Sequence, residues 1–294
     1  MPFSPRKFSL GLTAVDLSLI GVAMLWGSSY PAVKFVLSFS SVILFIFLRF
    51  SLTALFMLPI FVSGVRGRYK ETVLVGAILG ILLFLIFYCE TAGVKRTLAV
   101  NAAFFISLCV LFTPLIESAI VRTFPRPRVV LACAISCLGA GLMGATEEFE
   151  FKFNDGDMII MAAAFLRALG VVATKRLMAN RALDSGAVTF IQMLVVALIS
   201  GAWILILDVD FAVPTDTGFW LVTLYLVVFC TLIAFYTQTH MIGKTSPTHV
   251  VLIMGTEPLF GAVFAVLLLQ EGLSLIQYFG GVLIVMSTYV VIKK

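Results

Sequence analysis

The chain has 294 residues, of which 61% are hydrophobic and only 12% are charged, and its formal net charge is +5. An average soluble domain carries about 25% charged residues, so this chain has too few charges to cover a water-facing surface, and an integral membrane protein is predicted instead of a soluble one. In a membrane protein a positive balance is typical of basic residues on the cytoplasmic side, and no nucleic-acid partner is expected.

Apolar runs long enough to cross a bilayer recur along the whole chain. A hydrocarbon core about 30 Å thick needs about 20 apolar residues in a helix. The first run follows Arg6 and Lys7 and has no clear signal-peptide cleavage site, which predicts an uncleaved first span. In chain order the runs predict ten spans, at 16–37, 40–62, 72–94, 97–121, 127–146, 157–177, 186–207, 217–240, 247–269 and 273–292. The linkers are too short to hold a soluble catalytic domain.

The basic residues predict which side of the membrane each loop faces. With the N-terminus in the cytoplasm, most lysines and arginines fall on the cytoplasmic side, which is the distribution that membrane insertion favours. Arg49 and Arg167 remain inside spans. The outer side then holds Lys34, Lys95, Arg96 and Lys152. The sequence therefore predicts that both termini are cytoplasmic.

The second half of the chain repeats the first. In one alignment, here called the FY alignment, FYCETAGVKRT at 87–97 matches FYTQTHMIGKT at 235–245 and pairs Glu90 with Gln238. In another, here called the Asp alignment, Asp16, Ala23, Ala32 and Lys34 match Asp157, Ala164, Ala173 and Lys175. The offset, which is the difference in residue number between matched positions, is slightly smaller in the Asp alignment than in the FY alignment. Polar residues are rare in this chain, so the polar matches favour a true duplication.

The repeat is predicted to be inverted. Each half, 1–146 and 147–294, holds five predicted spans. Because five is odd, the second half enters the membrane from the opposite side. Inverted repeats that meet near the bilayer midplane are typical of transporters, because they supply two nearly equivalent arrangements for alternating access.

Three stretches make the chain resemble the drug/metabolite transporter superfamily, and within it the EamA-type ten-helix carriers. They are LWGSSYPAVK at 25–34, the stretch from TLAVNAAF to FTPLIE at 97–117, and EPLFGAVFAVLLLQEGLS at 257–274. Within the superfamily the chain looks most like bacterial amino-acid and metabolite exporters, including the aromatic amino-acid exporters. In one departure, FLRALG places Arg167 where the family usually has a large aromatic or apolar residue.

The resemblance implies an all-α integral membrane fold in a bacterial inner membrane. Ten transmembrane helices would form two inverted five-helix repeats, 1–146 and 147–294, around a central cavity. We expect spans one, three, four, six, eight and nine to line that cavity.

Polar residues inside spans are costly and usually face a cavity or a partner helix. Glu90 and Gln238 are expected either to bind a substrate ammonium, with Glu90 also accepting a coupling proton, or to hydrogen-bond neighbouring helices. Tyr88 and Tyr236 are expected to contact the substrate or to anchor their helices at the membrane interface.

Two charged residues are predicted near the middle of the membrane. Arg167 lies ten residues after Asp157, so at about 1.5 Å per residue it is deep in the bilayer. It is expected either to clamp a substrate carboxylate or to form a structural ion pair with Glu90 or Glu257. Glu257 precedes Pro258, which frees backbone carbonyls and indicates a binding point or a packing kink.

Further candidates lie in spans one, four and nine. Asn101 and His249 match in the FY alignment, and His249 is of a type that titrates near neutrality or serves as a structural hydrogen-bonding group. Trp26 and Tyr30 belong to a polar stretch of the first span that is expected to form a cavity wall or gate.

The sequence thus predicts a secondary-active or facilitative transporter that exports small metabolites, with amino acids, including aromatic and other apolar ones, as the first expectation. The alternatives are a multidrug or quaternary-ammonium exporter of the same fold and a passive channel. The expected partners are a small-molecule substrate and the lipid bilayer, with protons as an open alternative. A monomer is expected, and a dimer remains open.

No residue spacing indicates catalysis or metal binding. The five cysteines lie in apolar runs without a CxxC pair, and the chain has two histidines. We therefore expect no enzyme activity, no cofactor and no metal site.

Overall fold

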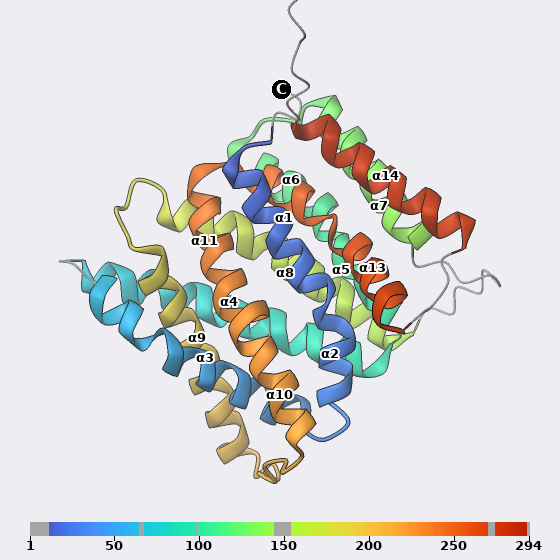
Figure 1. The fold of residues 1–294 in the computed structure, drawn as a ribbon. Coiled ribbons are helices and arrows are strands. Elements are labelled where there is room, and N and C mark those ends of the chain that lie inside the picture. Colours follow the sequence, from blue (N-terminus) through green and yellow to red (C-terminus); the bar gives the residue numbers. More distant parts are fainter. Residues whose placement is uncertain (1–11, 65–67, 98, 144–153, 270–273, 293–294) are drawn as a thin grey trace, which may run out of the picture.

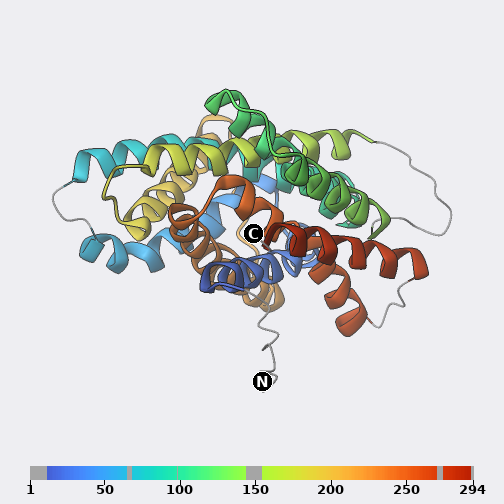
Figure 2. The ribbon, with the colours of Figure 1, turned by 90° about the horizontal axis from the view of Figure 1, so that it is seen from above.

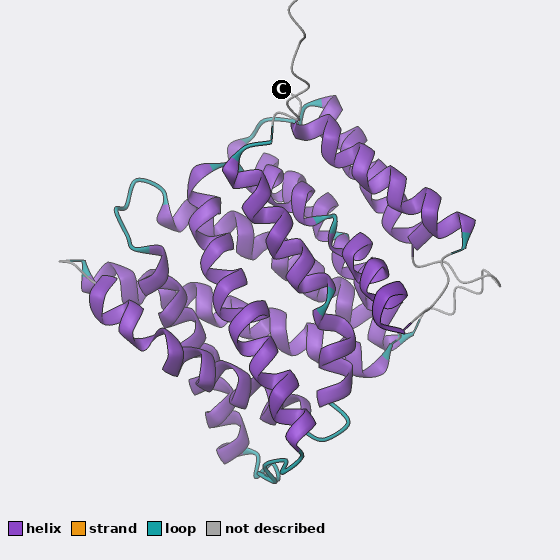
Figure 3. Ribbon diagram, viewed as in Figure 1, coloured by secondary structure: helices purple, strands orange, loops and turns teal. Residues whose placement is uncertain are grey.

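The computed structural model describes residues 12–64, 68–97, 99–143, 154–269 and 274–292. Within these ranges the chain forms helices joined by loops, with no strand (Figures 1 and 3). The predicted all-α class is confirmed.

The helices of the two halves follow the same order. The first half holds α1 (Ala14–Gly27), α2 (Ser29–Val36), α3 (Val42–Gly64), α4 (Tyr69–Arg96), α5 (Ala99–Ser107), α6 (Cys109–Val121) and α7 (Pro127–Met143). The second half holds α8 (Asp155–Met178), α9 (Ser185–Ile206), α10 (Thr217–Tyr225), the π-helix η1 (Leu226–Ile233), α11 (Ala234–Lys244), α12 (Pro247–Met254), α13 (Glu257–Leu269) and α14 (Leu275–Ile292).

Within the described ranges, eight helical stretches are long and apolar enough to cross a membrane. They are Ala14–Val36, Val42–Ser63, Tyr69–Arg96, Asn101–Val121, Asp155–Met178, Ser185–Ile206, Thr217–Lys244 and Pro247–Phe264. The fifth and tenth predicted spans coincide with two shorter apolar helices, Pro127–Leu142 and Leu275–Thr288, and the predicted ends at 144–146 and 273 lie outside the described residues. Large apolar side chains face outward, among them Leu205 (84% exposed) and Leu275 (87%), as a lipid surround requires.

Matching caps begin the first long helix of each half. Thr13 and Asp16 form a capping box at the start of α1, and Asn154 and Asp157 form one at the start of α8. In a capping box two side chains satisfy backbone N–H groups that the helix itself leaves free. The repeated aspartates of the sequence are therefore helix-capping residues.

Several of the membrane-crossing stretches are interrupted. The helix axis breaks at Ser28 between α1 and α2, at Leu108 between α5 and α6, and at Gly255 and Thr256 between α12 and α13. The last break comes directly before Glu257 and Pro258, close to where the sequence predicts the kink.

Close helix pairs hold the bundle together. α3 packs along α9, α4 packs along α8 and α9, and α7 and α14 form a pair at one side of the molecule (Figures 1 and 2). Gly80 of α4 lies against Val195 of α9, so closely that a Cβ atom on it would come within 2.7 Å of the valine Cβ. A Cβ atom on Gly76 would come within 2.5 Å of the Cβ of Ile191. Small residues at such a crossing let two backbones approach, and this brings α4 and α9 together around the centre of the bundle.

Candidate functional site

A narrow cavity lies at the centre of the bundle, between α1, α2, α3, α4, α8, α9 and α11. The volume open to the centres of water molecules is about 60 Å³. A smaller adjoining cavity lies beside the breaks in α5–α6 and α12–α13. The lining differs from expectation, because spans two and seven contribute side chains to the main cavity, whereas spans four and nine line the adjoining one.

Equivalent residues of the two halves face the main cavity in pairs. Trp26 of α1 and Arg167 of α8 are paired by the Asp alignment, and Glu90 of α4 and Gln238 of α11 are paired by the FY alignment. Phe87 and Phe235 form another pair of the FY alignment.

Arg49 of α3 and Gln192 of α9 also form a pair, at an offset between those of the two alignments. The N-caps of the two helices fix this match. The Leu44 N–H donates to Ser41 before α3, and the Ala187 N–H donates to Asp184 before α9. Arg49 and Gln192 lie equally far along the chain from these caps.

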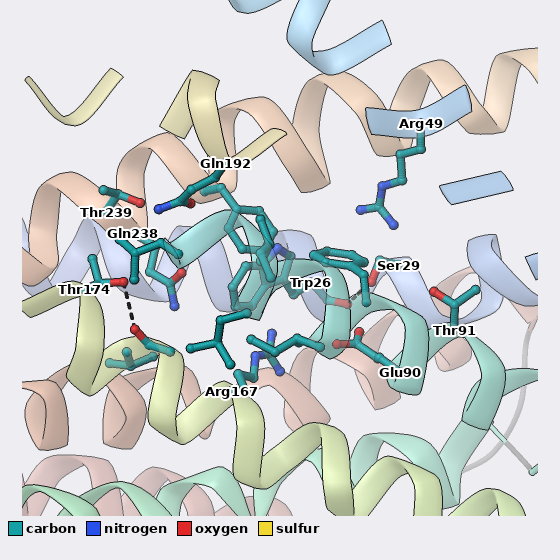
Figure 4. Close-up of a pocket in the computed structure, with 18 of the residues that line it drawn as sticks. Trp26, Ser29, Arg49, Glu90, Thr91, Arg167, Thr174, Gln192, Gln238 and Thr239 are labelled. Atoms are coloured by element: carbon teal, nitrogen blue, oxygen red, sulfur yellow. Dashed lines mark hydrogen bonds between the residues drawn. The ribbon is translucent and has the colours of Figure 1, made fainter. Parts of the chain in front are cut away.

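The two ends of the cavity differ in charge. Figure 4 shows the labelled polar side chains in two groups, with Trp26 and Arg167 between them. The first group, here called the charged end, consists of Ser29, Arg49, Glu90 and Thr91. The second group, here called the amide end, consists of Thr174, Gln192, Gln238 and Thr239.

A cluster of four side chains lies between these ends. Arg167 pairs with Glu257, with an Nη1–Oε2 distance of 3.3 Å, and its guanidinium lies 4.2 Å from the centre of the Trp26 ring. The Tyr30 hydroxyl donates to the other oxygen of Glu257, at 2.5 Å. Arg167 therefore has an internal counter-ion and a stacked aromatic ring, which favours the structural alternative for this residue and makes Glu257 its partner.

Arg49 is held in a different way. It is 3% exposed, its Nε donates to the Thr231 hydroxyl at 2.7 Å, and its guanidinium lies 5.1 Å from the centre of the Phe87 ring. Within the described part of the chain its two terminal nitrogens make no hydrogen bond. The sequence-based site prediction omitted Arg49, although an arginine within an apolar span was a signal of a role.

Glu90 also has a carboxylate without a hydrogen-bonding partner among the described residues. It is half-buried and lines the cavity. It lies at the same end of the cavity as Arg49 (Figure 4). The charged end therefore holds one basic and one acidic group that are both open to a ligand.

The π-helix η1 breaks the symmetry of the two halves. Tyr69–Arg96 and Thr217–Lys244 are equivalent and both 28 residues long, but only the second contains a π-helical segment. Trp26 Nε1 donates to the Cys230 carbonyl in this segment, at 2.9 Å. Thr231, the partner of Arg49, belongs to it as well. Such segments are rare and frequently occur at functional sites, and this one orients two cavity side chains.

Two predicted aromatic site residues lie outside the cavity. Tyr88 stacks on Trp203, with ring centres 5.2 Å apart, and Tyr236 is 39% exposed beside His240. Each directly follows a cavity-lining phenylalanine along its helix, so the repeated motif lies at the cavity while its tyrosines point away from the lining.

The matched pair in spans four and nine is also outside the cavity. Asn101 is half-buried in α5 and does not line it. His249 Nε2 contacts Asp16 Oδ1 at 2.7 Å and joins the start of α12 to the start of α1. The structure thus brings together Trp26, Tyr30, Glu90, Arg167, Gln238 and Glu257, and separates Tyr88, Asn101, Tyr236 and His249 from them.

Equivalent lysines hydrogen-bond to backbone carbonyls at opposite ends of the bundle. Lys34 Nζ donates to the Thr97 carbonyl at the end of α4, and Lys175 Nζ donates to the Gly243 carbonyl near the end of α11. Each lysine directly follows a cavity-lining residue, Val33 or Thr174 in turn. Asp157 adds a contact at the first end, where it accepts a hydrogen bond from the Thr97 hydroxyl at 2.6 Å.

Among the described residues no group of three or more histidine, cysteine, aspartate or glutamate side chains is placed to hold a metal ion.

The sequence resembles known transporters, and the fold resembles a solved structure. The model of the EamA-like transporter family matches residues 13–145 and again 154–293. A protein of Archaeoglobus fulgidus named "Uncharacterized transporter" is 27% identical over 276 residues, which cover 94% of this chain and 85% of that protein. Another protein of that name, from Methanothermobacter thermautotrophicus, is 27% identical over 74% of this chain and 62% of its own length. A solved structure titled "Crystal structure of protein" shares the fold at a TM-score of 0.77 and 18% identity, over 94% of this chain and 96% of that chain.

Proposed function

This chain belongs to the EamA-like transporter family, and from that premise we propose that it is a secondary carrier that exports small metabolites, amino acids first among them, by alternating access. The observation that carries the proposal is the central cavity, to which equivalent positions of both halves contribute side chains. A cavity built in this way has two ends formed by equivalent positions of the two halves, and such a repeat supplies the two arrangements that alternating access needs.

In this proposal the halves 1–146 and 147–294 are inverted repeats. Two contacts support the inversion. The start of α8 lies against the end of α4 through Asp157 and Thr97, and the end of α8 lies near the end of α11 through Lys175 and Gly243. The ends of α4 and α11 are equivalent positions, and the length of α8 separates them. α4 and α11 therefore run in opposite directions, which supports the proposed inversion.

The distribution of lysine and arginine supports an orientation with both termini in the cytoplasm. The bacterial inner membrane is proposed from the family resemblance. The charged end of the cavity then faces outward and the amide end faces the cytoplasm. A single chain encloses the cavity, so the proposed working unit is a monomer.

An amino-acid substrate suits the composition of the cavity. Arg49 and Glu90 offer one positive and one negative charge, and Trp26, Phe87 and Phe235 supply aromatic walls. A zwitterion with an apolar side chain matches all three features. Glu90 beside aromatic rings also suits a quaternary ammonium compound, which makes cationic drugs the second candidate class, although the buried Arg49 opposes a cation.

Counterflow in proteoliposomes tests this proposal. Vesicles are preloaded with one unlabelled amino acid, the labelled compound is offered outside, and the pH gradient is varied. We expect saturable, overshooting uptake for a few apolar amino acids, because a carrier exchanges substrate across both faces. Uptake that does not saturate would indicate a channel. Absence of counterflow with every amino acid, together with counterflow of a quaternary ammonium compound, would contradict the substrate class.

A further inference from the structure

Equivalent positions of the two halves lie at opposite ends of the cavity and hold different types of side chain. At the charged end Arg49 and Glu90 are ionisable, and at the amide end their equivalents are Gln192 and Gln238. Glutamine is comparable in length to glutamate and carries no charge. The duplication has thus produced one charged and one neutral version of the same half-site within a single chain.

Arg49 is a buried cation whose remaining hydrogen-bonding capacity points to an anionic ligand. Thr231 fixes its Nε, and rings of Phe45, Phe50 and Phe87 lie within 5.9 Å of its guanidinium carbon. A buried charge is costly unless it is paired. Two terminal nitrogens of a guanidinium match the two oxygens of a carboxylate, and this arginine faces the cavity with both of them unused by the described residues.

Arg167 does not offer the same capacity. Glu257 neutralises it, and its guanidinium lies over the Trp26 ring. A substrate carboxylate that bound Arg167 would have to displace an existing counter-ion, whereas one that bound Arg49 would meet two terminal nitrogens that no described residue hydrogen-bonds. Similarly, Glu257 already accepts hydrogen bonds from Arg167 and Tyr30, whereas Glu90 accepts none from the described residues.

We propose that the charged end is the half-site that recognises the zwitterionic head group of an amino acid, with Arg49 binding the carboxylate and Glu90 binding the ammonium. The inference rests on the proposed transport of amino acids and adds which residues select them. The amide end is the neutral counterpart, which accepts the head group through weaker hydrogen bonds as the substrate passes. This arrangement makes the protein selective for molecules that carry both charges.

The test compares three apolar amino acids with analogues that lack one charge. L-Leucine, L-methionine and L-phenylalanine are competed in binding to the reconstituted protein against their amides, which lack the carboxylate, and against the acids that lack the amino group. The variants Arg49→Gln and Glu90→Gln copy the residues of the amide end. The matched controls are Arg68→Gln and Glu71→Gln, which remove the same charges from an exposed ion pair outside the cavity lining.

The wild-type protein should bind the zwitterion about 10- to 100-fold more tightly than either analogue, as expected for the loss of one charged hydrogen-bonded contact. Arg49→Gln should reduce the affinity for the amino acid to that of the amide and leave the affinity for the amide unchanged. Glu90→Gln should reduce the affinity for the amino acid to that of the acid that lacks the amino group, and it should leave the affinity for this acid unchanged. The two controls should each change the affinity for the zwitterion less than threefold.

Equal weakening of the amino acid and its amide by Arg49→Gln would assign Arg49 a structural role and overturn the inference, as would unchanged binding in both charge-removing variants. Arg49→Lys keeps the charge with a different geometry. Its affinity for the amino acid should lie between the wild-type value and the affinity for the amide, which preserves the test if Arg49→Gln does not fold. A wild-type protein that neither binds nor exchanges any amino acid would instead overturn the proposed function, and the inference with it.

Discussion

At the scale of single residues, the cavity separates charges that are paired within the protein from charges that are open to a ligand. Arg167 and Glu257 belong to the first kind, and Tyr30 and Trp26 complete their surroundings. Arg49 and Glu90 belong to the second kind. A buried pair of the first kind adds little net stability, but removing one partner leaves an uncompensated buried charge.

Glu257→Gln should therefore destabilise the protein strongly, by about 3–5 kcal/mol, because it leaves Arg167 without its counter-ion. Adding Arg167→Gln to that variant should restore much of the loss. Thermal unfolding of the purified wild-type protein, both single variants and the double variant measures the coupling. Strictly additive losses in the double variant would show that the two side chains do not act as a pair.

Residue identity alone could not separate these two kinds of charge. The sequence indicates that Arg167 and Glu257 are deep in the membrane, and it leaves open whether Arg167 binds substrate. The pairing of Arg167 with Glu257 depends on how α8 packs against the break between α12 and α13. Such packing between helices cannot be read from the sequence of each span alone. The sequence does not identify Arg49 as part of a repeated pair, because its equivalent, Gln192, fits neither the FY alignment nor the Asp alignment.

At the scale of helices, close approach between α4 and α9 determines where the cavity walls lie. Gly80 contacts Val195 and the backbone of Gln192, so this crossing also positions a side chain of the amide end. The small-residue spacing at Gly76 and Gly80 is visible in the sequence, but the partner helix is not.

Gly80→Ala should lower the free energy of unfolding by about 1–3 kcal/mol, because the added methyl group overfills a packed crossing. Gly21→Ala is the matched control, since nothing lies within 4 Å of the Cβ position on α1. It should be neutral, or stabilising by up to about 1 kcal/mol through helix propensity. Thermal unfolding in detergent measures both, and equal effects of the two substitutions would contradict the packing described for α4 and α9.

Helix interruptions were less predictable than helices. Apolar runs predict the positions of the spans because lipid demands long apolar helices, and Pro258 indicates one break in advance. The break at Leu108 and the π-helix at Leu226–Ile233 have no proline or charge to mark them. In the π-helix, side chains of other helices, Trp26 and Arg49, hydrogen-bond to the irregular segment, and these contacts cannot be read from its own sequence.

At the scale of the whole molecule, the protein has one central cavity with two ends, which we propose open in alternation. Val94 and Ile242 are equivalent lining residues at opposite ends, and they are 1% and 2% exposed. Lys34 hydrogen-bonds to the end of α4 that holds Val94, and Lys175 hydrogen-bonds near the end of α11 that holds Ile242. Removing one lysine should favour opening of its own end and, if the ends are coupled, closure of the other.

The most direct measurement of this coupling is the rate at which a polar maleimide labels Val94→Cys or Ile242→Cys in protein whose five native cysteines are replaced by alanine. Lys34→Ala should increase labelling at position 94 and decrease it at 242, and Lys175→Ala should do the reverse. Labelling that rises at both positions together, or that changes at one position independently of the other, would contradict alternating access through this cavity.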